Sequence, residues 1–514
     1  MTATLPGAYL GNHLAAQLRA ASVGREGDVF VIRHPGCEVV SFGEFFSNAE
    51  KLAAALVEVG VCPGDRVAVQ VEKSVAMLEL YVATLLAGAV FLPLNPGYTT
   101  SEVSYFLGDA TPKLLVCDPS KIEALGEVAR AAQVADIWSL SGDETGSLIA
   151  ARDAQNMGFE ARAHGADDLA ATLYTSGTTG RSKGAMLSHG ALASNSQTLK
   201  QYWRFSAHDV LIHALPIFHT HGLFVATNIT LMAGGRAIFM PRFDAAAICS
   251  VMPEATAMMG VPTFYTRLLN QPSLAHASRN MRLFISGSAP LLSETHERWR
   301  EVTGHAILER YGMTETNMNT SNPYDGARRA GTVGLSLPGV EVIVTDPETG
   351  ERLGENEIGM LEVRGPNLFA GYWQMPEKTA QELRASGFFI TGDLGIIDGD
   401  GYVSIVGRQN DMIISGGLNI YPKELELLLD GLPGVLETAV IGVPHPDFGE
   451  AVVAVLVPRA GEEIDLDDVR AGIETAVAKF KRPKHYAILT ELPRNTMGKV
   501  QKKSLREEFL NLFG

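Results

Sequence analysis

A run of small, hydroxyl-bearing and glycine residues lies at 175–184 and contains a lysine near its end. A strand-like apolar segment, residues 169–174, leads into the run, and Lys183 closes it. Glycine lets backbone N–H groups approach phosphate oxygens, hydroxyls add donors, and the lysine adds positive charge. The run is not a Walker A loop, because no second glycine precedes a Lys-Ser or Lys-Thr pair at the required spacing. It predicts a phosphate-binding loop, with a flexible surface turn as the alternative.

Three further loops follow strand-like runs and carry polar or glycine residues. In open α/β sheets, ligands bind beyond the carboxyl ends of the strands, so we expect these loops to share one crevice. The loops are His219-Thr220-His221-Gly222 after residues 211–217, Ser286-Gly287-Ser288-Ala289 after residues 281–285, and Tyr311-Gly312-Met313-Thr314-Glu315 after residues 307–310.

Glu315 and the two histidines each have two interpretations. Beside a phosphate loop, Glu315 is a candidate Mg²⁺ ligand, because magnesium favours few carboxylates together with substrate phosphates. Taken alone, Glu315 would be a solvated surface acid. His219 and His221 are either a metal-binding pair or satisfied core histidines. No carboxylate stands beside them at the spacing of a zinc site, which favours the core interpretation.

Glycine-containing turns recur towards the carboxyl end. Asp393, in a Thr-Gly-Asp turn, is placed to accept hydrogen bonds from ribose hydroxyls, as acids do in nucleotide sites, and its alternative is a turn aspartate. A Gly-Arg pair ends at Arg408, and a Ser-Gly-Gly loop begins at Ser415. Lys499 follows Gly498, and its alternative is an ordinary surface lysine.

The composition excludes several classes of protein. The 514 residues carry 42 basic and 58 acidic side chains, a net charge of −16, which argues against a nucleic-acid binder. The apolar stretch at 80–94 is too short to span a membrane and predicts a buried helix followed by a short strand. The four cysteines form no C-x-x-C pair, which favours a reducing, cytoplasmic location. Residues 1–25 contain Arg19 and Arg25 and no acid, which leaves an organellar presequence as an alternative.

The elements that position these motifs alternate between strand-like and helix-like segments. Runs such as residues 66–71, 113–117 and 255–261 predict doubly wound α/β subdomains with parallel sheets. After about residue 330, shorter strands separated by turns indicate a β-rich, barrel-like subdomain. From about Arg408 the pattern is that of a compact α+β unit. We expect an N-terminal domain over 1–407 and a small, mobile C-terminal domain over 408–514.

In their order and spacing, these motifs resemble those of the adenylate-forming superfamily, which includes acyl-CoA synthetases, nonribosomal adenylation domains and firefly luciferase. The resemblance covers essentially the whole chain. More narrowly, residues 213–223, 259–269, 281–292 and 308–325 resemble the malonate-activating ligases. The resemblance implies an acid–thiol ligase with ATP and CoA as co-substrates and Mg²⁺ as cofactor. The acid attacks the α-phosphate of ATP to give an acyl-adenylate and pyrophosphate, and CoA then displaces AMP.

The resemblance also assigns roles to individual residues. The predicted catalytic residues are Thr175, His219, Glu315 (the Mg²⁺ ligand) and Lys499. The predicted ATP- and AMP-binding residues are Thr175, Ser176, Gly177, Thr178, Thr179, Gly180, Lys183, Ser286, Gly287, Ser288, Ala289, Glu309, Arg310, Tyr311, Gly312, Met313, Thr314, Asp393, Arg408 and Lys499. The predicted CoA-binding residues are Ser415, Gly416, Gly417 and Leu418. The predicted acyl-pocket residues are His219, Thr220, Arg267, Arg282, Ser288 and Met318.

The second carboxylate of malonate requires a counter-charge in the pocket, because a buried isolated anion is very costly. Arginine suits a carboxylate through its bidentate geometry. Arg267 matches the malonate-ligase pattern specifically, whereas an arginine at the position of Arg282 recurs in relatives that use uncharged acyl groups. We therefore predict that Arg267 pairs with the distal carboxylate, with an exposed arginine on the helix after Pro262 as the alternative.

Other properties implied by the resemblance concern movement and control. The C-terminal domain is expected to rotate between the two half-reactions about Asn410, where the family usually has Asp or Lys. Lys499 resembles a site at which relatives are acetylated, so a lysine acetyltransferase and a deacetylase are candidate partners. The alternatives are an acyl-CoA synthetase of broader specificity, with methylmalonate as one open substrate, an adenylation module that serves a carrier protein, and a nucleotide-binding interaction protein without catalysis.

Overall fold

The computed structural model describes residues 9–175, 182–415, 418–495 and 498–513. Its contacts divide the chain into two compact units. Unit 1 comprises Met1–Glu341 and Arg364–Phe389, and unit 2 comprises Val342–Val363 and Ile390–Gly514. The boundary at residue 408 was predicted as the limit of a moving domain and stays a prediction.

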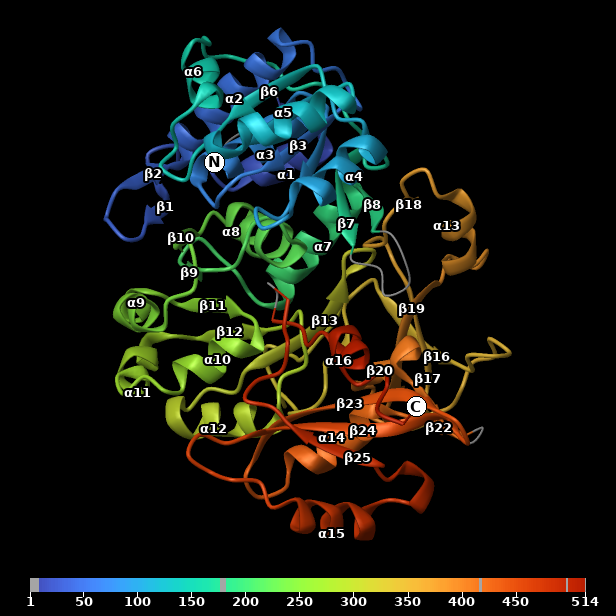
Figure 1. Ribbon diagram of the computed structural model, residues 1–514. Helices are drawn as coiled ribbons and strands as arrows, with labels where there is room; N and C mark the ends of the chain where they lie inside the picture. The colour runs from blue at the N-terminus through green and yellow to red at the C-terminus, as the bar shows by residue number, and fades with distance from the viewer. Residues whose placement is uncertain (1–8, 176–181, 416–417, 496–497, 514) are drawn as a thin grey trace. The chain divides into compact units, whose positions relative to one another are not determined.

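A seven-stranded sheet forms one half of unit 1 (Figure 1). Five adjacent strands of this sheet, including the one at an edge, are parallel to one another, and α3 (Val75–Leu86) and α5 (Ile122–Ala131) supply crossovers between parallel neighbours, as predicted for α/β subdomains. In spatial order the strands are β18 (Gly371–Tyr372), β8 (Lys183–Ser188), β7 (Leu169–Thr175), β4 (Val90–Pro93), β3 (Arg66–Gln70), β5 (Leu114–Cys117) and β6 (Asp136–Ser139).

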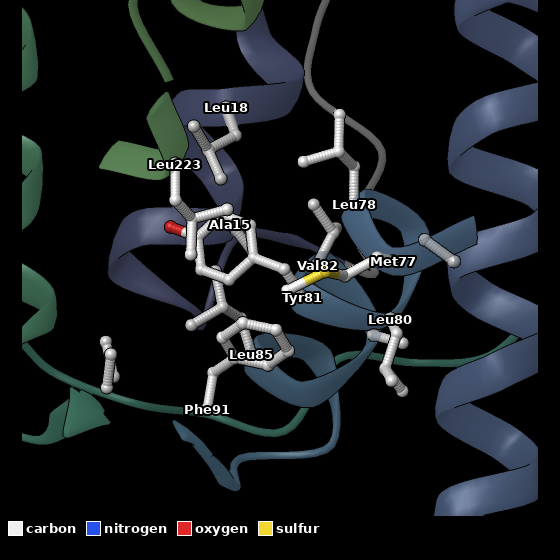
Figure 2. Packing of buried hydrophobic residues seen from close by; sticks show 14 of the residues in the cluster. Ala15, Leu18, Met77, Leu78, Leu80, Tyr81, Val82, Leu85, Phe91 and Leu223 are labelled. Carbon is white, nitrogen blue, oxygen red and sulfur yellow. The ribbon is translucent and has the colours of Figure 1, made fainter. Parts of the chain in front are cut away.

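The helix α3 is buried on every side. Ser74 caps its first turn by accepting a hydrogen bond from the backbone N–H of Met77, and all twelve of its residues are buried. Figure 2 shows Tyr81 packed against Phe91 of β4, and the two ring centres lie 5.4 Å apart. A helix made almost entirely of apolar residues needs such an enclosed place, and its one acid, Glu79, pairs with Arg152 over 3.1 Å. The predicted buried helix followed by a short strand is confirmed.

A nine-stranded sheet forms the other half of unit 1. Strands β1 and β9 to β13 are parallel to their neighbours in the central part, and β2, β14 and β15 add antiparallel edges. In spatial order they are β15 (Leu335–Ser336), β14 (Asn317–Ser321), β13 (Leu308–Met313), β12 (Leu283–Ser286), β11 (Ala257–Gly260), β9 (Val210–His213), β10 (Arg236–Phe239), β1 (Val29–Arg33) and β2 (Val39–Ser41).

Unit 2 contains two smaller sheets. The β-rich segment after residue 340 forms the order β16 (Glu341–Thr345), β17 (Gly359–Arg364), β19 (Phe389–Ile397) and β20 (Val403–Arg408). The end residues Glu341, Arg364 and Phe389 of these strands belong to unit 1. The second sheet has the order β22 (Leu418–Ile420), β21 (Ile413–Ser415), β24 (Gly449–Pro458) and β23 (Val435–His445), and β25 (His485–Ile488) pairs with β24.

The remaining helices complete the two units. Those of unit 1 are α1 (His13–Ala20), α2 (Phe42–Glu58), α4 (Thr100–Ala110), α6 (Ser147–Asp153), α7 (His189–Tyr202), α8 (Asn228–Ala233), α9 (Ala245–Val251), α10 (Pro262–Leu268), α11 (Leu274–Ala277), α12 (Ser293–Thr303) and α13 (Pro376–Glu382). Those of unit 2 are α14 (Pro422–Asp430), α15 (Leu466–Ala476) and α16 (Lys502–Glu508). Within the described residues, no helix is both long and apolar enough to cross a membrane.

Candidate active site

The carboxyl ends of the central strands of the nine-stranded sheet lie side by side. Gly260 pairs with Ser286 in the register of β11 and β12, and Ser286 pairs with Glu309 in that of β12 and β13. Strand β9 runs parallel to β11 and ends at His213. The loops that follow these strands therefore leave one edge of the sheet, which is where α/β folds bind ligands.

His219, Thr220 and His221 follow β9 at this edge. The backbone N–H of His221 donates to Nδ1 of His219 over 3.4 Å, and the His221 side chain lies 3.3 Å from the Ser288 hydroxyl. Thr220 and His221 are buried. Burial, and then the positive charge of Arg310, lowers the pKa of His221 well below its ordinary value, so the ring is neutral. Among the described residues, no group of three His, Cys, Asp or Glu side chains is placed to hold a metal ion.

Arg310 is a buried cation on β13. Only 3% of the residue is exposed, and Nε and Nη2 of its guanidinium have no hydrogen-bond partner in the described structure. The guanidinium lies against Gly287, where a Cβ atom would be 2.4 Å from Cζ, so a larger residue there would displace the guanidinium. Burial lowers the pKa of Arg310 to about 9, which leaves it charged at neutral pH.

The Tyr-Gly-Met-Thr-Glu run forms a hairpin rather than the predicted loop. Strand β13 continues to Met313, and β14 begins at Asn317, with Met313 paired to Asn317. A Cβ atom on Gly312 would lie 1.9 Å from the carbonyl oxygen of Asn317, so glycine permits this close pairing. Glu315 lies in the turn with 4% of its surface exposed, and Met318 packs into the apolar core beside the sheet.

The phosphate loop begins and ends on paired strands. Thr175, the last residue of β7, pairs with Lys183, the first residue of β8. The predicted residues Ser176, Gly177, Thr178, Thr179 and Gly180 lie outside the described residues. Lys183 Nζ is 3.2 Å from Glu382 Oε1 and 4.1 Å from the centre of the Tyr372 ring. The Tyr372 hydroxyl lies within hydrogen-bond distance of two carboxylates, at 3.0 Å from Glu315 Oε1 and 2.6 Å from Glu382 Oε2.

The two arginines that the sequence offered for the acyl pocket have different surroundings. Arg267 is exposed on α10, and its Cζ lies 5.9 Å from the centre of the Phe243 ring. Arg282 is engaged, because its Nε donates to Asp209 Oδ1 over 2.6 Å and its other nitrogens donate to the carbonyls of Trp203 and Arg204. The role predicted for Arg267 stays a prediction.

Unit 2 carries the remaining predicted residues. Asp393 on β19 and Arg408 on β20 are paired in register, and Arg408 Nε donates to Asp393 Oδ1 over 2.7 Å. Asp393 is buried. Lys499 is exposed, and its backbone N–H donates to Asn495 Oδ1 over 3.0 Å.

The predicted CoA and hinge residues also lie in unit 2. Ser415 ends β21 and is buried, Leu418 begins β22 and is exposed, and Gly416 and Gly417 lie outside the described residues. Asn410 lies in a short helical turn, Gln409–Asp411, in which Asp411 accepts a hydrogen bond from Arg506 over 2.7 Å.

Sequence reasoning missed Tyr372 and Glu382 as neighbours of the phosphate loop. Glu382 stands 199 positions from Lys183, and no spacing rule links two residues so far apart. It also placed Arg310 among the nucleotide contacts without noticing its burial. In the sequence, the burial of Arg310 is indicated only by its place in an apolar, strand-like run. That no counter-ion in the described part of the chain faces its guanidinium is visible only in the fold.

Comparison with known proteins identifies the family. The chain matches the AMP-binding enzyme family over residues 18–373 and the AMP-binding enzyme C-terminal domain over residues 424–499. The protein is an AMP-binding enzyme. The crystal structure of ATP-bound MatB from Rhodopseudomonas palustris is 55% identical, covers 98% of this chain and 100% of its own, and superposes with a TM-score of 0.96.

Curated relatives of this AMP-binding enzyme act on different acids. A malonate–CoA ligase of Arabidopsis thaliana is 34% identical and is aligned over 88% of this chain and 79% of its own. A feruloyl-CoA synthase of Amycolatopsis is 36% identical and is aligned over 93% of this chain and 95% of its own. These relatives confirm the predicted fold and the acid–CoA ligase chemistry, whereas the choice of acid requires an argument from the site.

Proposed function

We propose that this AMP-binding enzyme is an ATP-dependent malonate–CoA ligase. It joins malonate to the α-phosphate of ATP, which forms malonyl-AMP and releases pyrophosphate, and then transfers the malonyl group to the thiol of CoA, which releases AMP. The similarity to MatB over the whole chain and to the malonate–CoA ligase of Arabidopsis supports the proposal. ATP, malonate and CoA are then its small-molecule substrates.

The observation that carries the choice of a dicarboxylic acid is the unpartnered guanidinium of Arg310. A buried charge without a partner costs several kcal/mol, so a ligand that brings the opposite charge gains that energy. Arg310 lies at the sheet edge beside Gly287 and in the electrostatic range of His221, two segments that the acyl pocket was predicted to include. A distal carboxylate of malonate fits this charge, whereas a monocarboxylic acid of the ferulate type brings its only carboxylate to the reacting end.

The other residues have separate roles in the first half-reaction, the formation of malonyl-AMP. Lys183 offers its ammonium to the phosphates, and Thr314 its hydroxyl to the α-phosphate. The buried carboxylate of Glu315 is an oxygen donor of the kind Mg²⁺ prefers, and the ion would neutralise phosphate charge there. Asp393 and Arg408 hold the ribose, and Lys499 meets the α-phosphate and the substrate carboxylate. The neutral ring of His221 keeps a second positive charge away from Arg310.

Several finer points belong to the same proposal. The C-terminal domain, residues 408–514, carries Lys499 and the Ser415 loop and presents them in turn, with Asn410 at the pivot. Acetylation of Lys499 would remove its charge and stop adenylate formation. We place the enzyme in the cytoplasm, because its four cysteines are free and two of them, Cys37 and Cys62, are exposed.

The test is acid-dependent exchange of pyrophosphate into ATP across a panel of malonate, methylmalonate, acetate, butyrate and ferulate. We expect malonate to give the highest kcat/KM, by about 100-fold or more over the monocarboxylates, because only a dicarboxylate pairs with Arg310. Comparable rates on butyrate or acetate would instead assign a broader acyl-CoA synthetase, and preference for ferulate would contradict the role of Arg310.

A further inference from the structure

A chain of polar contacts in unit 1 joins the phosphate-loop lysine to the metal-site carboxylate. Lys183 Nζ lies 3.2 and 3.4 Å from the two carboxylate oxygens of Glu382. The Tyr372 hydroxyl reaches both Glu382, over 2.6 Å, and Glu315, over 3.0 Å. Lys378 Nζ is 2.9 Å from Glu382 Oε1. Glu382 and Tyr372 therefore connect two groups that handle the same phosphates.

The elements that carry this chain are fixed to one another. Strand β18 pairs with β8 through Tyr372 and Ala185, and α13 packs beside β18 (Figure 1). The backbone N–H of Tyr372 donates to the hydroxyl of Thr379 on α13 over 2.9 Å, and Glu382 is the last residue of that helix. The carboxylate of Glu382 is thus held at a set distance from the first residue of β8, Lys183.

The surroundings of Lys183 explain how Glu382 can fix the position of its ammonium. A lysine side chain has a long, flexible stem and three donors, so its ammonium needs outside contacts to occupy one place. Glu382 and the face of the Tyr372 ring supply these contacts on one side, and Lys183 and Glu382 are both about four-fifths buried. The ammonium keeps donors for an anion that approaches from elsewhere.

The proton of Tyr372 extends the link to Glu315. A phenol has one proton, so it donates to only one of the two carboxylates at a time. A carboxylate engaged by a metal ion needs no donor, which leaves the Tyr372 proton to Glu382.

We propose that Glu382 is a positioning residue for the nucleotide, which holds the ammonium of Lys183 where the phosphates of ATP meet it and is tied through Tyr372 to Glu315. The inference rests on the proposed function in one respect, namely that ATP binds at Lys183 and Glu315. The opposite role, in which Glu382 competes with phosphate for Lys183, predicts the opposite sign when its charge is removed.

The experiment is calorimetric titration of the full-length protein with ATP and Mg²⁺ in the absence of any carboxylic acid. Glu382→Gln keeps the shape of the side chain and removes its charge, and we expect the Kd of Mg·ATP to rise about tenfold. Glu377→Gln is the matched control, because Glu377 lies exposed on the same helix, and its Kd should equal that of the unchanged protein. Melting temperatures of all variants show whether they are folded.

A double-mutant cycle separates positioning from general weakening of the fold. If Glu382 acts through Lys183, Glu382→Gln should change the Kd less than about twofold once Lys183→Met is present, because contacting residues are not additive. A tighter Kd in Glu382→Gln, an unchanged Kd, or a full tenfold effect in the Lys183→Met background would each overturn the inference.

Tyr372→Phe provides a second route that does not depend on Glu382→Gln. It keeps the ring beneath Lys183 and removes the hydroxyl that reaches both Glu382 and Glu315, so the gain in ATP affinity that Mg²⁺ brings should fall about threefold. An unchanged gain would overturn the link through Tyr372. If the unchanged protein itself fails to bind Mg·ATP, the proposed function fails instead.

Discussion

Two cationic side chains of unit 1 have opposite surroundings, since one is paired with a carboxylate and the other, among the described residues, is not. Lys183, beside the phosphate loop, has the carboxylate of Glu382 at 3.2 Å and the Tyr372 ring at 4.1 Å. Arg310, at the edge of the nine-stranded sheet, is more deeply buried, and two of its three nitrogens have no partner. The first arrangement lowers the free energy of the empty site, and the second raises it. This difference indicates which of the two side chains determines specificity for the acid.

The charge of a paired cation is already partly compensated before its ligand arrives, whereas an unpaired buried cation gains the full energy of pairing when its ligand binds. ATP carries several charges and binds with Mg²⁺, so its binding does not depend on a single unpaired cation. Malonate exceeds acetate by one carboxylate only, and discrimination requires that this carboxylate meet a charge with no other partner. We therefore expect Arg310 to select the acid, and Lys183 to serve ATP binding whichever acid is used.

The largest expected effect is that of Arg310→Met. It removes the counter-charge of the distal carboxylate, so the preference for malonate over acetate, measured as the ratio of kcat/KM in pyrophosphate exchange, should fall about 100- to 1000-fold. Lys183→Met should lower both substrates' rates together and leave the ratio unchanged. An unchanged preference for malonate over acetate in Arg310→Met would contradict the role of Arg310 as the selective residue.

Arg282→Met sharpens the contrast between structural and selective arginines. Asp209 is buried and loses its 2.6 Å partner, so we expect the free energy of unfolding to fall by about 2–3 kcal/mol, somewhat less than for a fully buried pair because Arg282 is partly exposed. Urea titration measures this loss. The ratio of malonate to acetate activity should not change, and a collapse of that ratio would reassign the carboxylate to Arg282.

The pH dependence of selectivity should follow Arg310. Burial lowers its pKa to about 9, so the free enzyme loses the guanidinium charge as pH rises through that value, and the charge is complete below it. Between pH 8 and pH 10 the malonate-to-acetate ratio of kcat/KM should fall about tenfold. Because the ratio cancels groups that both acids need, a ratio that stays flat up to pH 10 would contradict the lowered pKa of the Arg310 guanidinium.

Arg267→Ala should have the smallest effect. The side chain is exposed on α10, where water already solvates its charge, so we expect the ratio to change less than about threefold. Melting temperature should stay within about 2 °C of the unchanged protein, since exposed substitutions cost little. A loss as large as that expected for Arg310→Met would restore the assignment made from the sequence.

The sequence permitted prediction of the fold class and of the order of the motifs. Alternation of apolar strands and helices identified β3, β5 and β11 and the buried helix α3, because local periodicity survives in parallel sheets with covered faces. The hairpin at Gly312 was missed, since its Tyr-Gly-Met run lacks a turn signal and Asn317 supplies the left-handed residue, with φ of 50°.

Only part of the candidate site could be predicted from the sequence. Asp393 and Arg408 were predicted together because both belonged to recognisable motifs, and they lie on paired strands. The Lys183–Glu382 pair and the lack of a partner at Arg310 were not, because each depends on which distant segments pack around one side chain. Burial of a charge is a property of the fold, and an arginine in a strand-like run does not reveal its counter-ion.

The central claim is that Arg310 is an uncompensated buried charge until the acid binds. Its most direct test is the unfolding free energy of the unchanged protein and of Arg310→Met, each measured with and without malonate in the presence of AMP. Without malonate, Arg310→Met should be as stable as the unchanged protein or more stable by about 1–4 kcal/mol. Saturating malonate should stabilise only the unchanged protein, and acetate neither. Strong destabilisation by Arg310→Met without ligand, or equal stabilisation of both proteins by malonate, would contradict the claim.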